Sequence, residues 1–464
     1  MKKRLALFLA TVLLVGQTGC DLFTDGYDIS PNSASTTTLP LLMSGSQLEL
    51  INIYTGQVDR ISNVFIQRLA GTDQQYATYA TYNINETDTN NDFDSIYQGG
   101  LINAQNMIDQ ATAEGSPYYV GIGKIMKAML LGIATDVFGD VPNREALQGK
   151  TNFNPAYDPQ EIVLQDIQTL LTEGIAELQK PASSNKIQPR TDDLIFNGNI
   201  EGWIKTAWIV KARYANRLSR RDPSGSATQA LQFLDAAYAA GLNSSADDAK
   251  APFGGTGSDL NQFYAFNNAR PNYVKMGARL VDLMKSLNDP RLGVYATEDT
   301  NGEISGTPLG TTDQSSSDIG EYFASPAASV PMVTYVEAKF IEAEAALRLG
   351  QLPRAQAAYT EAITAHFNEL GVQGQLPAYL AANGTLSGTN ALAQIMTQKY
   401  IATFLQLEGW ADYRRTKLPL LTPDPTGIID VIPERLPTSQ NERVNNKNAT
   451  VVQDLAVPVY WAQP

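Results

Sequence analysis

Apolar and polar positions follow a helical pattern most clearly in the stretch Pro117–Leu147. Apolar side chains recur there at helical spacing and define one face: Ile122, Ile125, Met126, Met129, Ile133 and Val137. Ser116 before Pro117 is typical of a helix start, and Gly139 followed by Pro142 is typical of a helix end. Small residues leave room for a neighbouring helix on another part of the surface: Gly121, Ala128 and Gly132. The stretch therefore predicts a packed core helix that ends in a turn.

Helical periodicity also extends over much of the remaining chain. The segments that show it are Leu41–Ala70, Tyr97–Ala113, Pro159–Leu178, Asn199–Arg221, Gln229–Ala240, Met276–Leu287, Val333–Leu370 and Asn390–Trp410. Asn199 is a candidate N-cap, and Gly350 divides Val333–Leu370 into two helices. Because this pattern dominates, we expect an all-α fold.

Part of the helical pattern resembles a tetratricopeptide repeat. Ala355, Tyr359 and Ala362 match the small–aromatic–small spacing of the second helix of that repeat, although the first helix lacks its usual tryptophan. Helical hairpins are predicted in three places: Tyr97–Phe138, Pro159–Arg221 and Val333–Ala365. We expect one domain over residues 41–464, with a helical scaffold at about 41–221 and 333–421 and a loop-rich insert at about 222–332.

The first forty residues differ from the rest. Met1–Gly19 has a basic start, a short apolar run and small or polar residues before Cys20, which is the layout of a secretory signal. Cys20 is the only cysteine, so a disulfide within the chain is excluded, and we predict lipidation at Cys20 after cleavage. Residues 20–40 are polar and predict a lipidated tether.

Charge and residue counts exclude several kinds of function. The chain has a formal net charge of −14, which argues against binding to nucleic acid or to anionic lipid surfaces. His366 is the only histidine, so triads with more than one histidine and zinc sites of histidine and cysteine are excluded. The oxygen-rich run Thr87–Asp94 lacks the register of an EF-hand, and a loop is preferred there to a calcium site. No cofactor is expected.

Six short motifs occur in the order found in one known family. FGDVPNREAL (138–147) resembles the F-G-D-x-P-x-x-E-A-L signature of the SusD/RagB family of nutrient-binding lipoproteins. The other matching blocks are YDISPNSAS (27–35), the helix after Asn199, LNDPRLGVY (287–295), QLEGWADYRRTKLPLL (406–421) and IPERLPTSQNERVNN (432–446). Asn199 stands where the family has aspartate, and Gln17 stands where lipoprotein signals usually have leucine.

The resemblance implies a structure and a location. The implied fold is all-helical, with tetratricopeptide-like hairpins packed against a loop-rich half. Members of the family lie on the outer surface of the outer membrane, held by a lipid anchor. They cap a TonB-dependent transporter of the SusC type and help to capture oligosaccharides or peptides. The resemblance thus implies binding without catalysis.

Two other functions remain open from the residues alone. A glycoside hydrolase on a helical scaffold needs only two carboxylates, and 48 acidic residues supply many pairs. A repeat scaffold that binds other proteins is the second alternative, supported by the partial repeat at Val333–Ala365.

Aromatic residues in polar surroundings are the candidates for ligand binding. Sugars and apolar peptide side chains both stack on exposed rings that have polar neighbours. Two stretches fit this description: Tyr76, Tyr79 and Tyr82 in the first, and Phe263, Tyr264, Phe266 and Tyr273 in the second. We predict that both contribute to one shared site, with packing in the core as the alternative for individual rings. The four tryptophans lie in blocks whose packing alone explains them.

Overall fold

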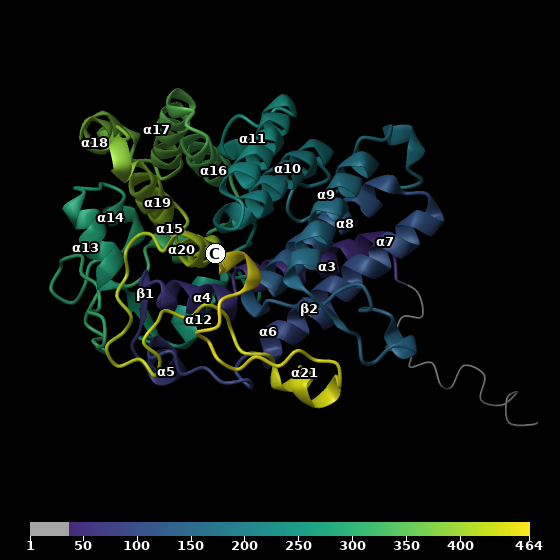
Figure 1. Cartoon of the computed structure of the whole chain (residues 1–464), viewed down its shortest axis with the longest axis horizontal. Helices are drawn as coiled ribbons and strands as arrows, with labels where there is room; N and C mark the ends of the chain where they lie inside the picture. The colour runs from purple at the N-terminus through teal and green to yellow at the C-terminus, as the bar shows by residue number, and fades with distance from the viewer. Residues whose placement is uncertain (1–36) are drawn as a thin grey trace, which may run out of the picture.

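The computed structural model describes residues 37–464 (Figure 1). The predicted signal peptide, the lipidation site Cys20 and most of the tether lie outside these residues. The all-α prediction is confirmed, since helices alternate with loops throughout and the strands are only two to four residues long. None of the helices in residues 37–464 is long and apolar enough to cross a membrane.

The N-terminal part of the scaffold is built from paired helices that pack against each other in sequence order (Figure 1). Its helices are α3 (Leu39–Tyr54), α7 (Ile102–Glu114), α8 (Pro117–Phe138), α9 (Gln160–Leu178), α10 (Ile200–Arg217) and α11 (Pro223–Ala239). A π-helical turn, Ser95–Leu101, leads directly into α7. The first turn of α3 takes up the last two residues of the predicted tether.

The central helix α8 has the predicted boundaries. All of its residues are buried except Lys124 and Lys127, because α7, α9 and α10 pack around it. Gly139 ends the helix with a φ of +83°, a conformation that favours glycine. Ser116 does not cap α8 with its side chain; its Oγ instead accepts a hydrogen bond from the backbone N–H of Ile187.

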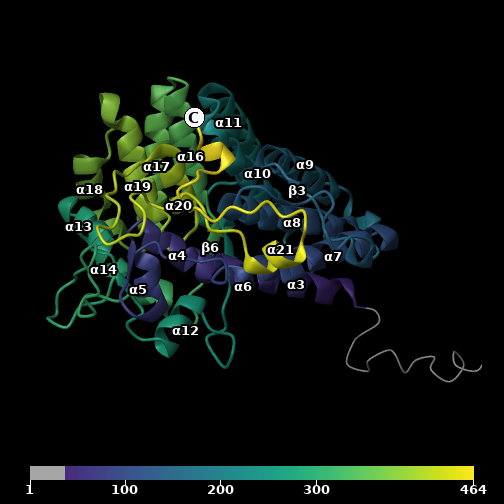
Figure 2. The same cartoon turned by 60° about the horizontal axis from the view of Figure 1, so that its bottom comes forward.

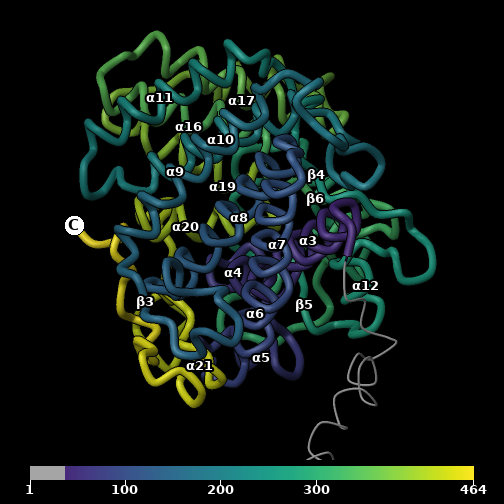
Figure 3. Tube along the Cα trace, turned by 90° about the vertical axis from the view of Figure 1, so that its right-hand side faces the viewer, coloured from purple at the N-terminus to yellow at the C-terminus, as the bar shows by residue number. Residues whose placement is uncertain are grey.

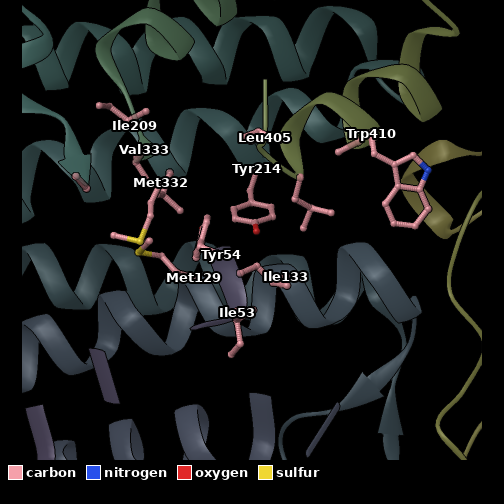
Figure 4. Close-up of a cluster of buried hydrophobic side chains, with 14 of the residues drawn as sticks. Ile53, Tyr54, Met129, Ile133, Ile209, Tyr214, Met332, Val333, Leu405 and Trp410 are labelled. Carbon is pink, nitrogen blue, oxygen red and sulfur yellow. The ribbon is translucent and has the colours of Figure 1, made fainter. Parts of the chain in front are cut away.

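The core lies where α3, α8 and α10 meet the second helical group (Figure 4). Met129 and Ile133 of α8 lie near Tyr214 of α10 and Tyr54 of α3 in this cluster. The second group consists of α16 (Tyr335–Arg348), α17 (Leu352–Glu369), α18 (Leu376–Asn383), α19 (Ala391–Ala402) and α20 (Glu408–Thr416). Helices α16 and α17 form the predicted hairpin, and Gly350 turns the chain between them with a φ of +70°.

Some segments divide further than their periodicity predicts. Leu41–Ala70 contains most of α3, which ends at Tyr54, then α4 (Gln57–Phe65) and the start of β1 (Leu69–Gly71). Gln67 turns the chain between α4 and β1 with a positive φ. Asn390–Trp410 divides into α19 and α20 at Leu405, which also has a positive φ. Helix α11 begins before Gln229, because Asp222 accepts a hydrogen bond from the Gly225 N–H and caps it.

The loop-rich half lies below the helical layer in Figure 1. Its elements are α5 (Gln74–Ala80), α6 (Asn90–Asp94), α12 (Gln262–Ala269), α13 (Ala278–Ser286), α14 (Leu292–Tyr295), α15 (Glu321–Ala324) and α21 (Gln440–Asn445). Three antiparallel strand pairs hold the loops: β1 with β5 (Val274–Met276), β2 (Val141–Pro142) with β3 (Tyr157–Asp158), and β4 (Ala249–Ala251) with β6 (Val330–Val333). The C-terminal segment runs across this half from α20 to α21 (Figure 2).

Candidate functional site

The fold brings the two predicted aromatic stretches together. Strand β1 precedes the first stretch and pairs with β5, which directly follows Tyr273 of the second. The Tyr76 and Phe266 rings pack edge to face with centroids 5.1 Å apart, and Phe266 packs in the same way on Tyr273 at 6.0 Å. The two stretches therefore form one aromatic cluster, although ligand binding by its members stays a prediction.

Most of the predicted rings are buried, contrary to the expectation that they would be exposed. Tyr76, Tyr79, Tyr82, Phe263 and Phe266 are buried, whereas Tyr264 and Tyr273 are half-buried. The sequence left packing in the core as the alternative for individual rings, and five of the seven rings are packed in this way. Tyr264 and Tyr273 are the two that retain surface for a ligand.

Polar groups within the cluster explain why tyrosines are tolerated there. The Arg60 Nε donates to the Tyr76 hydroxyl at 2.8 Å, and its guanidinium lies 4.3 Å from the centre of the Phe266 ring. The Tyr79 hydroxyl donates to Asp88 Oδ1 at 3.0 Å. Burial raises the pKa of both phenols. Each hydroxyl is thereby satisfied inside the fold, so neither needs a ligand as its partner.

Tyr82 is separated from the other predicted rings. Its backbone has a φ of +62°, and its ring packs edge to face on Phe65 at 6.0 Å. Its hydroxyl accepts a hydrogen bond from the Asp424 N–H at 2.8 Å, and burial raises its pKa to about 12. Tyr82 therefore attaches the C-terminal segment to the first stretch.

Beside Tyr82 lies a small cavity, which we call the Arg279 pocket. Its volume is about 40 Å³, enough for water or one functional group of a ligand. Five segments converge on it, and the residues that line it are Val64, Gln67, Leu69–Gly71, Ala80, Tyr82, Gly277–Arg279, Thr307–Thr311 and Asp424. These segments adjoin both predicted stretches, since Ala80 and Tyr82 belong to the first and Gly277 follows β5.

The Arg279 pocket offers three different polar side chains. Arg279 Nη2 donates to the Leu420 carbonyl at 3.1 Å, while its buried Nε has no hydrogen-bond partner within residues 37–464. Asp424 Oδ2 accepts from the Gly310 N–H at 3.0 Å, and Gln67 donates to the Thr422 carbonyl. No salt bridge neutralises Arg279 or Asp424 within the described chain. The pocket can thus both donate to and accept from a polar ligand.

Aliphatic side chains lie exposed on the two segments that flank this pocket. Leu309 is 40% exposed and precedes Gly310, which is bonded to Asp424. Leu420 is 78% exposed, and its carbonyl is the one that Arg279 binds. Sequence patterns did not identify this pocket, because its residues come from distant segments and none forms a motif with its neighbours. Two residues that line the pocket, Gln67 and Tyr82, have a positive φ. The sequence does not show this conformation, so it could not have pointed to the pocket.

His366 belongs to the core. It is buried, and its Nδ1 lies 2.9 Å from Arg291 Nη1. Burial and the Arg291 charge lower its pKa well below the ordinary value, so it stays neutral. His366 therefore packs in the core and takes its hydrogen-bond partner from within the fold.

A family model described as "Starch-binding associating with outer membrane" matches residues 31–437. A SusD/RagB family protein from Bacteroides thetaiotaomicron superposes with a TM-score of 0.80 at 22% identity, over 92% of this chain and 99% of that chain. A chitin-binding SusD homolog from Flavobacterium johnsoniae gives a TM-score of 0.78 at 22% identity, over 91% and 98% of the two chains. No curated protein matches the sequence. Because the family model covers most of the sequence, the chain belongs to the SusD-like family.

Proposed function

We propose that this protein is a cell-surface nutrient-binding lipoprotein. It captures oligosaccharides, or peptides, and delivers them to a partner TonB-dependent transporter of the SusC type in the outer membrane. Support comes from the family, whose description is starch binding in association with the outer membrane, and from the chitin-binding relative of the same fold. Binding without catalysis is the activity proposed.

The observation that carries this proposal is the set of polar groups in the Arg279 pocket. An unneutralised guanidinium, a carboxylate and an amide converge there from three separate segments, beside Tyr82. Hydroxyl-rich sugars and peptide backbones both need donors and acceptors side by side. The pocket accepts one group of such a ligand, while half-buried Tyr273 and the flanking leucines offer contact surface nearby.

Attachment to the membrane is the second part of the proposal. Cys20 follows a signal-like segment, and lipidation there supplies an anchor that several acyl chains make stable. The tether after Cys20 places the binding domain outside the outer membrane, beside the transporter that receives the ligand.

Calorimetric titration with a neutral oligosaccharide series and a peptide series tests the binding site. Arg279→Met removes a charged donor and is expected to weaken one binding event about tenfold or more, since such bonds contribute roughly 1.5–3 kcal/mol. Arg190→Met is the control, because Arg190 is exposed and its side chain makes no hydrogen bond within residues 37–464. Equal affinities for wild type and Arg279→Met would reject this pocket. Release of reducing sugar by the purified protein would favour the hydrolase instead.

Isolation from native membranes tests the anchor and the partner. The wild-type protein is expected to copurify with a SusC-like transporter from detergent extracts. The Cys20→Ala variant is expected in the soluble fraction, because the described chain has no membrane-spanning helix. Membrane retention of that variant, or absence of any transporter from the complex, would contradict this part of the proposal.

A further inference from the structure

We propose a second binding site, for a neutral oligosaccharide, on another part of the surface. It lies in a hollow of about 570 Å³ between helix α3 and the loop Pro252–Leu260, which we call the Phe253 hollow. It shares no residue with the Arg279 pocket, so it adds a site to the proposed function and does not depend on the first. Figure 3 shows α3, β4 and α12 side by side on this part of the molecule.

The size and the walls of the Phe253 hollow suit a sugar. Its volume lies within the range of about 300–1,000 Å³ found for small-molecule sites, whereas the Arg279 pocket is far smaller. Phe253 is half-buried, so one part of its ring is fixed by the core while another part faces outward. Leu48 of α3, which is 53% exposed, and Leu260 extend the apolar surface. Such a surface can cover the C–H face of a pyranose.

Unused polar groups surround this apolar surface. The side chains of Asn52 and Ser258 are exposed and make no hydrogen bond within residues 37–464. Asp259 Oδ2 accepts from the Gly254 N–H at 2.8 Å, which leaves Oδ1 free to accept from a ligand. An amide, a hydroxyl and a carboxylate oxygen are groups that hydroxyls of a sugar can pair with.

The charge of the hollow selects against anionic ligands. Asp259 is its one charged group, and none of the described residues that line it is lysine or arginine. The chain as a whole carries a net charge of −14, which adds to the repulsion of anions. A uronate or sulfated sugar would therefore lack a counter-ion in this site, and a neutral sugar needs none.

The walls of the hollow are fixed before a ligand arrives. The Gly255 N–H donates to the Asp259 carbonyl at 2.8 Å and closes the loop, and Gly255 has a φ of +77°. Asn261 follows the loop and ties it to the body through a bond from Nδ2 to the Ala328 carbonyl at 2.8 Å. On the opposite wall, Gln47 of α3 accepts from the Leu194 N–H. A site with fixed walls loses little entropy when it binds.

Titration with maltohexaose, hexa-N-acetylchitohexaose and an oligogalacturonate of similar length tests the inference. Phe253→Ala removes the ring, and Asn52→Trp fills the hollow from an exposed helical position whose side chain makes no hydrogen bond within the described chain. Phe253→Ala is expected to weaken one binding event for a neutral hexasaccharide roughly 5- to 150-fold, the loss associated with one stacked ring. Asn52→Trp is expected to weaken the same event, because its side chain occupies the volume that the sugar needs. The Arg279→Met variant is expected to bind the hexasaccharide at the Phe253 hollow with the affinity of the wild type. The oligogalacturonate is expected to bind this site more weakly than the neutral sugars.

Each outcome separates this inference from the proposed function. If Phe253→Ala and Asn52→Trp bind as the wild type does while Arg279→Met loses binding, the second site is rejected and the Arg279 pocket stands. If Phe253→Ala and Asn52→Trp both lose a binding event that the Arg279→Met variant still shows, the second site is supported whether or not the Arg279 pocket binds a ligand. Absence of any binding of neutral sugar to the wild type rejects the inference, as does an equal affinity of the hollow for oligogalacturonate. Thermal unfolding of Asn52→Trp shows whether a loss reflects misfolding.

Discussion

Buried ion pairs are the main feature of the protein at the scale of single residues. Arg217 of α10 lies between Asp136 of α8, at 3.0 Å, and Glu408 of α20, and all three are buried. Arg213, one turn earlier, forms a salt bridge with Glu337 at 2.6 Å and with Glu408 at 3.3 Å. A charge removed from water is costly unless it is paired, so the partners depend on each other. Arg213, Arg217 and Glu408 belong to motifs that the sequence analysis identified, but the motifs did not reveal that these residues form salt bridges.

Removing Arg217 is therefore expected to destabilise the fold strongly. Arg217→Met leaves two buried carboxylates with one cation fewer, and the loss expected is about 3–5 kcal/mol of unfolding free energy. Chemical denaturation followed by tryptophan fluorescence measures it. Arg443→Met is the control, because Arg443 forms a solvent-exposed pair with Glu86, and exposed pairs add little to stability. Similar losses of unfolding free energy in the two variants would show that the buried ion pairs stabilise the fold no more than the exposed pair does.

Glu408 and two further buried carboxylates make the stability depend on pH. Burial alone would raise the pKa values of Glu344, Glu408 and Asp412, but adjacent arginines and Lys399 overcome it and hold them below their ordinary values. Groups with a lowered pKa in the folded state stabilise it above their unfolded values, and that stability is lost as the pH falls. The melting temperature is thus expected to drop below about pH 4, near the unfolded values. A constant melting temperature from pH 6 to pH 3 would contradict this.

Close helix contacts dominate at the scale of elements. A Cβ at Gly132 of α8 would lie 1.7 Å from the hydroxyl of buried Tyr214 on α10, so the two helices approach through this glycine. Gly132→Ala is expected to cost about 1–3 kcal/mol by overpacking, although alanine alone favours a helix. Gly293→Ala in α14 is the control, because a Cβ there meets nothing within 4 Å. Urea denaturation compares the two variants, and equal stability would mean that α8 and α10 separate at little cost.

The elements also show what the sequence can and cannot predict. The limits of α8, the Asn199 cap and the turn at Gly350 follow from local signals, and the structure confirms all three. The breaks at Gln67 and Leu405 were missed, because a positive φ at a residue other than glycine is imposed by tertiary contacts. Ring exposure was mispredicted for a similar reason: Arg60 and Phe266 cover Tyr76, and they are brought there from other segments.

At the scale of the whole molecule, the helical scaffold and the loop-rich half share contacts along their length. Strand β4, which follows α11, pairs with β6, which precedes α16, next to the salt bridge from Lys250 to Glu369 of α17 at 2.7 Å. Arg213 of the scaffold donates to the Met332 carbonyl of β6 at 2.8 Å. Arg68, just before β1, donates to the Thr403 carbonyl after α19 at 2.6 Å. Separating the two halves would take these partners away from Arg213 and Arg68, which are both buried.

We therefore expect residues 41–464 to unfold as one domain, as the sequence predicts. Unpaired buried groups cost about 1–3 kcal/mol each, so a partly unfolded state would lose several such contributions at once. Scanning calorimetry is expected to show one transition whose calorimetric and van't Hoff enthalpies agree. The native tryptophans report mainly on the scaffold, because Trp203, Trp208 and Trp410 lie in α10 and α20. The difference in fluorescence between a Tyr264→Trp variant and the wild type reports on α12 in the loop-rich half. Coincident transitions from the two probes support one domain, whereas earlier loss of the α12 signal would make the loop-rich half a separate folding unit.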